Sequence, residues 1–229
     1  MSRSLQLIAI ASLWIAIACS DSAGGVRTIF TGDYPFTADE RRVIERIAVD
    51  TASEARQHLP ALPRQLTVRA QSGSRVIAEL GAIAEVAPPD YIVWTVDASR
   101  PEGVATIADS YLRVALLHEF HHLVRLTALP GNTLVDQVVS EGMATAFERD
   151  FGNWTSPWSR YPDNIASLVE EFLARPSEAT RSEWLTQHPD RRIRYRMGTY
   201  LVDQAMKKHD RNSAELVVTP TDEIVAARR

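Results

Sequence analysis

Two histidines and two glutamates near the middle of the chain form the pattern with the clearest chemistry. His118 and His122 lie four residues apart with Glu119 between them, which makes an HExxH motif, and Glu141 follows nineteen residues after His122. Neutral imidazole and carboxylate are good Zn²⁺ ligands, and a catalytic zinc site takes three protein ligands and keeps a fourth position for water. We therefore expect His118, His122 and Glu141 to bind one Zn²⁺ ion.

Glu119 has a different expected role, because it follows the first histidine and projects beside the metal rather than at it. In an HExxH motif on a helix, this glutamate acts as the general base. Zinc lowers the pKa of a coordinated water molecule to roughly 7, so that a neighbouring carboxylate can accept its proton. We expect Glu119 to be catalytic in this sense.

Two helices must hold these four residues together. The first is predicted from about Val104 to Leu126, and residues four apart lie on one face of a helix, so both histidines aim at one point. Pro130-Gly131 ends it, and a second helix runs from about Leu134 to Asp150. If this helix returns antiparallel, Glu141 faces back toward the histidines. The alternative is that Glu141 is only a carboxylate favoured near a helix N-terminus.

The rest of the mature chain predicts an α+β fold, with a small N-terminal sheet, the active-site helix, and a mostly helical C-terminal lobe. Thr37-Ala-Asp-Glu40 is a capping box that starts a helix ending near His58. Patterning predicts strands at 26–30, 66–70 and 91–96, and further helices at 75–86, 164–174, 180–187 and 190–209.

Composition limits the class of protein. The 229 residues, 45% hydrophobic and 24% charged, suit one globular domain, which we place at residues 27–229. The formal net charge of −4 argues against a nucleic-acid partner, because nucleic-acid binding needs a basic face.

The first residues have the pattern of an export signal. A short positive start precedes an apolar run from Leu5 to Ala18, and the only cysteine is Cys19. This is typical of a lipoprotein-type signal peptide at 1–18, with a small polar tether at 19–26. We expect export to the cell envelope and a lipid anchor on Cys19, on the periplasmic side of a bacterial outer membrane. Ordinary signal cleavage and an uncleaved anchor are the alternatives.

Three blocks of sequence resemble a known family. Leu117–Arg125 contains the HExxH motif, Val139–Ala144 reads Val-Ser-Glu-Gly-Met-Ala, and Tyr195-Arg-Met-Gly198 follows later. Together they resemble a bacterial family of predicted zinc-dependent proteases of unknown function, of the zincin-like gluzincin metallopeptidase type, over roughly residues 60–210. The resemblance implies that His118, His122 and Glu141 are the zinc ligands and that Glu119 is the general base.

One position departs from the gluzincin pattern. Gluzincins often carry an acidic residue four positions after the ligand glutamate, where it orients a ligand histidine, but here that position is Thr145. The orienting group must then come from elsewhere, and Asp136, Glu148 and Asp150 are candidates.

Other polar and aromatic residues have weaker expectations. Tyr195 is our first choice for the hydrogen-bond donor to the oxyanion, with Tyr200 and His188 behind it; the alternative is a half-buried helix tyrosine. We expect His121 to pack or to support the site rather than to bind metal. We expect the aromatic residues of one loop to fill a core or fix the loop, rather than line a cleft: Trp154, Trp158 and Tyr161.

The expected function is that of a zinc-dependent peptidase, with Zn²⁺ as cofactor and a peptide or protein as substrate. The alternative from another class is a non-catalytic envelope lipoprotein, peptide-binding or chaperone-like, with a structural or vestigial metal site. A third possibility is a metal-dependent hydrolase of some other bond, which shares the site and differs only in the cleft.

Overall fold

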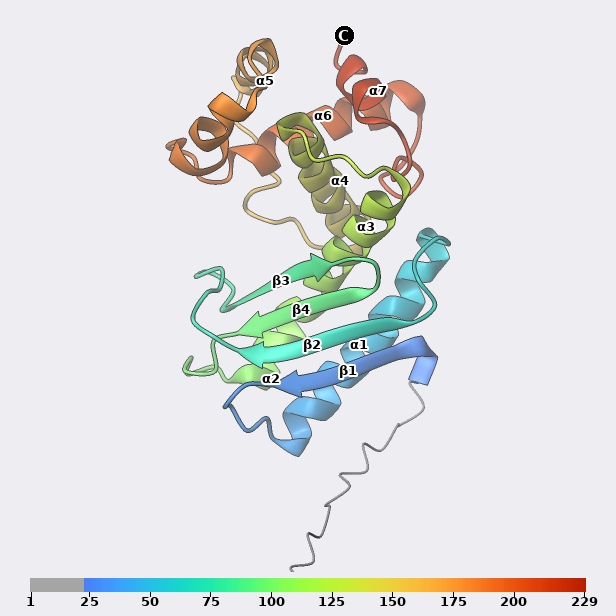
Figure 1. Ribbon diagram of the computed structural model, residues 1–229, viewed down its shortest axis with the longest axis vertical. Coiled ribbons are helices and arrows are strands. Elements are labelled where there is room, and N and C mark those ends of the chain that lie inside the picture. The colour runs from blue at the N-terminus through green and yellow to red at the C-terminus, as the bar shows by residue number, and fades with distance from the viewer. Residues whose placement is uncertain (1–22) are drawn as a thin grey trace, which may run out of the picture.

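A computed structural model describes residues 23–229 and shows a sheet with covering helices at one end and a group of helices at the other (Figure 1). The α+β class predicted from the sequence is confirmed, as is a largely helical C-terminal part. The predicted signal peptide at 1–18 and Cys19 lie outside the described residues.

The elements follow one another along the chain as α and β segments first and helices afterwards. Their bounds are β1 Val26–Thr31, α1 Ala38–His58, β2 Leu66–Ser72, β3 Ala82–Ala87, β4 Tyr91–Val96, α2 Val104–Ile107, α3 Arg113–Ala128, α4 Leu134–Gly152, α5 Ile165–Ala174, α6 Ile193–His209 and α7 Thr221–Ala226. From residue 23 onward, each helix is too short or too polar to cross a membrane.

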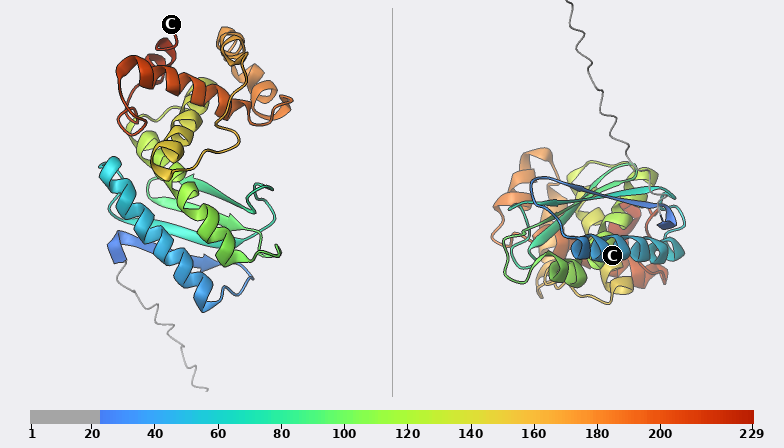
Figure 2. Two further views of the ribbon diagram at one scale, coloured as in Figure 1. Left: turned by 180° about the vertical axis from the view of Figure 1, so that it is seen from behind. Right: turned by 90° about the horizontal axis from the view of Figure 1, so that it is seen from below.

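The sheet is mixed, with strand order β1-β2-β4-β3. β1, β2 and β4 are parallel, and β3 pairs antiparallel with β4, so β3 forms one edge. In β2 buried residues alternate with partly exposed ones, as expected of a strand with one face in the core. Seen from behind, α1 and α3 run across one face of this sheet (Figure 2).

The helix predicted from Val104 to Leu126 is confirmed with one irregularity. α2 and α3 are joined by a π-helical turn at Ala108–Leu112, and the backbone stays right-handed through both junctions. Such turns occur often at functional sites. The histidines and Glu119 lie on α3, C-terminal to this turn.

The helix α4 lies between the two halves of the molecule. Its Phe147 packs in the core beneath the sheet, whereas Leu134, Val138 and Met143 belong to a second core with α5, α6 and α7. A helix buried on nearly all sides needs apolar residues around its whole circumference, and α4 has them. The second predicted helix is thereby confirmed, and it is the central element.

Two predictions of local structure need correction, and a third is confirmed with an irregularity. Residues 75–86 were expected to be helical, but Gly81 has a φ of +68° and β3 begins at Ala82, because pairing with β4 outweighs the helix propensity of this Ala- and Glu-containing stretch. The helix predicted at 180–187 is present but irregular, with α-helical residues at 181–182 and a π-helix at Glu183–Gln187. The tether predicted at 19–26 overlaps the domain, because Val26 is buried as the first residue of β1.

A buried arginine connects α3 to a distant segment. Arg125, 3% exposed, donates through Nη1 to the carbonyls of Val217 and Thr219 and through Nη2 to the hydroxyl of Thr221. Burial lowers the pKa of Arg125 to about 10, which leaves it charged at neutral pH. Several acceptors are needed to offset the desolvation of this charge.

α4 and α6 approach so closely that their backbones touch. A Cβ added to Gly198 would lie 2.8 Å from the Cα of Gly142 and would overlap the carbonyl of Val138, and a Cβ added to Gly142 would lie 2.5 Å from the Cα of Gly198. Both contacts are with backbone, which a side-chain movement cannot relieve. Only glycine fits at these two positions while the helices keep this distance.

We therefore predict that Gly198→Ala destabilises the protein by at least about 2 kcal/mol, because the two helices must separate to admit one methyl group. Denaturant unfolding measures this change. Gly152→Ala is the control, since a Cβ there meets only side-chain atoms of Val114 and Leu117, at 3.3 and 3.4 Å. Its effect should stay within about 1 kcal/mol. Equal stability of Gly198→Ala and the parent would contradict the close contact.

Candidate metal centre

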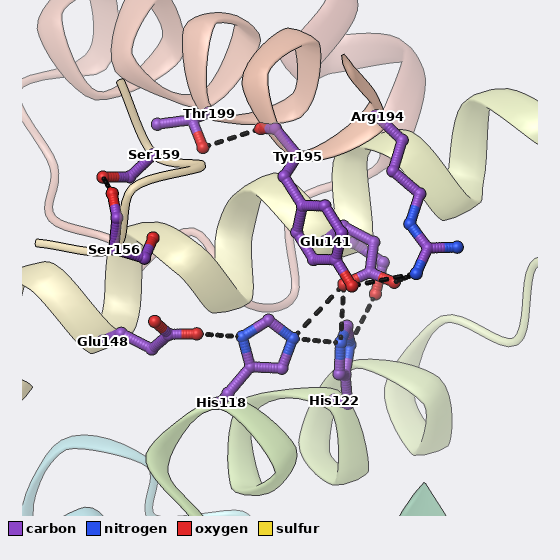
Figure 3. A network of polar contacts seen from close by, with 10 residues as sticks. His118, His122, Glu141, Glu148, Ser156, Ser159, Arg194, Tyr195 and Thr199 are labelled. Carbon is purple, nitrogen blue, oxygen red and sulfur yellow. Dashed lines mark hydrogen bonds and ion pairs between the residues drawn. The ribbon is translucent and has the colours of Figure 1, made fainter. Parts of the chain in front are cut away.

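The three predicted ligands meet at one point between α3 and α4. His118 Nε2 lies 3.0 Å from His122 Nε2 and 3.2 Å from Glu141 Oε2, and His122 Nε2 lies 3.6 Å from the same oxygen. Among the described residues, these three form the group of histidine, cysteine and acidic side chains that can hold a metal ion. Figure 3 shows the two imidazoles rising from α3 toward Glu141 on α4.

The spacing of the donor atoms fits zinc. Zinc bonds to nitrogen and oxygen are about 2.0–2.1 Å long, so two ligand atoms of a tetrahedral site stand about 3.4 Å apart. The three distances of 3.0, 3.2 and 3.6 Å bracket this value. A set of two imidazoles and one carboxylate is also a known catalytic zinc set.

Each ligand histidine has a partner on its other ring nitrogen. His118 Nδ1 contacts the carboxylate of Glu148, and His122 Nδ1 lies 3.0 Å from Ser140 Oγ. When Nδ1–H is donated outward, the lone pair of Nε2 is left facing the shared point, which is the tautomer that a metal requires. Of the three acidic candidates, Glu148 is the orienting group; Asp136 caps α4 and Asp150 contacts Ser213.

The charges around this point favour a cation. Burial opposes a charge on His118, but Glu148 and Glu141 outweigh it and raise its pKa well above the ordinary value. Burial would raise the pKa of Glu141, but its hydrogen bonds to His118 and His122 hold the pKa well below its usual range. The carboxylates thus favour positive charge at His118, whereas burial lowers the pKa of His122 and favours its neutral imidazole.

Glu119 lies beside the ligands and lines the same cavity. Glu119 as a whole residue is 7% exposed. Burial, together with Glu141 and Glu148, raises the pKa of Glu119 to about 8 against the opposing effect of His118. A nearby divalent cation favours the carboxylate and shifts this pKa down again. Such a group can both accept and return a proton near neutral pH.

A cavity of about 450 Å³ opens above the ligands. The strand β3 forms part of its wall through Ile83, Glu85 and Val86, and the loop after α4 contributes Trp154 and Trp158. The two tryptophans had been expected to fill a core or fix the loop rather than line a cleft. They do pack together, with ring centroids 5.7 Å apart, but both also face the cavity.

The third aromatic residue of this loop is placed differently. Tyr161 is 36% exposed, donates to Asp203 at 3.2 Å and contacts Tyr200. It fixes the loop against α6, as expected, and is not among the residues of the cavity wall.

Of the expected oxyanion donors, the cavity includes Tyr195 and neither of the other two. Tyr195 has its ring centroid 6.4 Å from that of His118, whereas Tyr200 packs on Tyr161 and His188 stacks on Trp184. Burial and Glu141 raise the pKa of Tyr195, so the phenol keeps its proton.

His121 packs rather than binds, as expected. It is fully buried, its ring lies 5.5 Å from that of Phe147, and it is not among the residues of the cavity wall.

Two residues at the site were not predicted, Arg194 and Ser140. Arg194 lines the cavity and donates to the hydroxyl of Tyr195 at 2.8 Å. Both are immediate neighbours of predicted residues, Tyr195 and Glu141. No spacing rule selects them, because their roles depend on how α4 and α6 meet.

The comparison with protein families agrees with this geometry. The model of a family described as "Predicted Zn-dependent protease (DUF2268)" matches residues 50–226. The chain belongs to this family, whose name indicates zinc dependence, and its histidine-histidine-glutamate cluster can hold the metal. Searches of curated proteins and of solved structures gave no match.

The first prediction from this site concerns metal content. Residues 20–229, purified and loaded with zinc, should hold about one zinc per chain by mass spectrometry, and His122→Ala and Glu141→Ala should lose most of it, since each removes one of three ligands. Zinc retained in Glu141→Ala would require another third ligand. Zinc at background level in the parent after loading would refute the site.

A second prediction tests a residue that positions a ligand rather than a ligand itself. Glu148→Gln keeps the shape of the side chain but weakens its hold on His118 Nδ1, so zinc affinity should fall about 10–100-fold in a chelator competition. Glu171→Gln, an exposed change on α5, should leave the affinity unchanged. Equal affinities for the two variants would show that Glu148 does not tune the metal site.

Proposed function

We propose that the protein is a zinc-dependent peptidase in which Glu119 is the general base. The observation that carries the proposal is the convergence of three donor atoms, spaced as zinc requires, beside a buried carboxylate at the floor of a cavity. Membership of a family named for predicted zinc-dependent protease activity agrees with it.

In the proposed reaction the metal and the protein side chains have separate roles. His118, His122 and Glu141 would hold Zn²⁺, which would supply Lewis acidity to polarise a carbonyl and to lower the pKa of water. Glu119 accepts the proton of the attacking water and passes it to the leaving amine nitrogen. Glu148 and Ser140 hold the two imidazoles in the tautomer and direction that this requires.

Tyr195 completes the proposed site as the donor to the developing oxyanion. Its protonated phenol lines the cavity next to His118, where a hydrogen-bond donor stabilises negative charge on the former carbonyl oxygen. Such donors are worth about 10²–10³ in kcat.

The wall of the cavity favours an extended peptide over another kind of substrate. β3 is an edge strand of the described sheet, and five of its residues, 82–86, line the cavity. The free edge of a strand can pair with an extended peptide through main-chain hydrogen bonds. This feature supports a peptidase over a metal-dependent hydrolase of some other bond.

The number of ligands supports a catalytic role over a structural one. Structural zinc sites usually have four protein ligands and are closed, whereas catalytic sites have three and keep an open position. Here three ligands border a cavity. We include in the proposal the export and Cys19 lipid anchor expected from residues 1–19, which place the activity in the cell envelope.

The test of the proposed function is Glu119→Gln. This variant should keep its zinc, because Glu119 is not a ligand, and should lose at least about 10²-fold in the rate of peptide release from unfolded, labelled casein. Glu45→Gln, an exposed change on α1, is the matched control and should match the parent. Full activity in Glu119→Gln would refute the mechanism. Parent protein that holds zinc and cleaves no peptide bond would support the non-catalytic alternative.

A further inference from the structure

Arg194 is the one cationic side chain of the described site that contacts both a proposed ligand and the proposed oxyanion donor. It lies in the first turn of α6, and its Nη2 donates to Tyr195 Oη at 2.8 Å and lies 3.4 Å from Glu141 Oε1. Figure 3 shows the guanidinium reaching down beside Tyr195 to the carboxylate. The arginine thus links α6 to the ligand on α4.

The contact with Glu141 distinguishes its two oxygens. Oε2 faces the histidines, at 3.2 Å from His118 Nε2 and 3.6 Å from His122 Nε2, whereas Oε1 faces Arg194. An oxygen engaged by a guanidinium is less available as a second donor to the same cation. Arg194 therefore favours one-oxygen ligation by Glu141, which leaves the fourth position of a three-ligand site free.

The contact with Tyr195 restricts the phenol proton. A phenol has one proton to donate, and its oxygen here accepts from Arg194, which has no acceptor to offer in return. The proton must then point in another direction. The ring contacts those of His118 and Trp158, with centroid distances of 6.4 and 6.1 Å, and Tyr195 lines the cavity, so the cavity is where the proton can find an acceptor.

We propose that Arg194 is a positioning residue, which holds Glu141 to one ligand oxygen and directs the phenol proton of Tyr195 into the cavity. The second half rests on the proposed peptidase function, because it concerns a reacting carbonyl. The first half concerns zinc binding and does not depend on any activity.

The guanidinium shape is part of this role. One planar group reaches a carboxylate and a phenol together, and its Cζ also lies 4.8 Å from the centroid of the Tyr195 ring. Both polar contacts are made by Nη2, and a lysine ammonium supplies the charge without the planar group that lies over this ring. Arg194→Lys should therefore keep only part of the zinc affinity and of the activity that Arg194→Met loses.

The first experiment measures zinc affinity by chelator competition. Arg194→Met should weaken zinc binding about 10–100-fold, as loss of a partner to a ligand does, and Arg194→Lys should fall between this variant and the parent. Tyr195→Phe should match the parent, since the phenol does not hold the ligand oxygen. Arg191→Met removes the same charge at an exposed neighbouring position and should also match it. Unchanged affinity in Arg194→Met would overturn the role at Glu141.

The second experiment measures casein cleavage by zinc-saturated variants. Tyr195→Phe should lower kcat about 10²–10³-fold with little change in KM, and Arg194→Met should do the same. The double variant should be scarcely worse than either single one, because the two residues act as a unit. Independent, multiplying losses would overturn the role at Tyr195, and a change in KM alone would show that Arg194 contacts the substrate.

The two experiments separate this inference from the proposed function. Weakened zinc binding in Arg194→Met, together with a parent that cleaves no peptide bond, would refute the peptidase function and the role of Tyr195 while retaining the role of Arg194 at Glu141. Normal cleavage by the parent with no effect of Arg194→Met in either experiment would refute only the inference.

Discussion

The direct backbone contact between α4 and α6 is the constraint on which the site depends. At Gly142 and Gly198 neither helix has a side chain, so the two axes approach as closely as backbone atoms permit. Glu141 immediately precedes the first of these glycines and Tyr195 stands one turn before the second. The contact therefore brings the start of α6 over the proposed metal ligand, and a wider separation would remove Arg194 and Tyr195 from the cavity.

The helix α4 supplies both one ligand of the proposed metal site and the residues that support the other two ligands. It supplies the ligand Glu141, and it supplies Glu148 and Ser140, which hold the outer nitrogens of His118 and His122. Glu141 and Glu148 are seven residues apart, about two helical turns, and so lie on one face. The acidic residue that contacts His118 Nδ1 thus stands seven positions after the proposed ligand glutamate, rather than four as in the gluzincin pattern that the sequence resembles.

The sequence predicts the metal ligands and the general base better than it predicts the residues that hold them in position. His118, Glu119 and His122 follow from their spacing on one helix, which brings positions four apart onto one face, and Glu141 follows from the expected antiparallel return of the next helix. Glu148 was one of three candidates, and Arg194 was missed, because both depend on the angle and distance between helices. The helix prediction for residues 75–86 was wrong for a related reason. The local propensity of this segment is helical, but pairing with β4 stabilises Ala82–Ala87 as a strand. The geometry within one helix and between two consecutive helices could be predicted, whereas the contacts made by residues of more distant elements could not.

The anchoring of Arg125 has a consequence for how the protein is made. Its acceptor Thr219 follows it by 94 positions, so α3 leaves the ribosome well before the carbonyls that satisfy its buried guanidinium exist. Until they arrive, burying this end of α3 leaves a charge without partners, which is strongly unfavourable. The helix bearing both histidines thus reaches its final packing only when this distant segment is in place. Assembly of the proposed metal centre is thereby tied to the docking of a segment that lies 94 positions further along the chain.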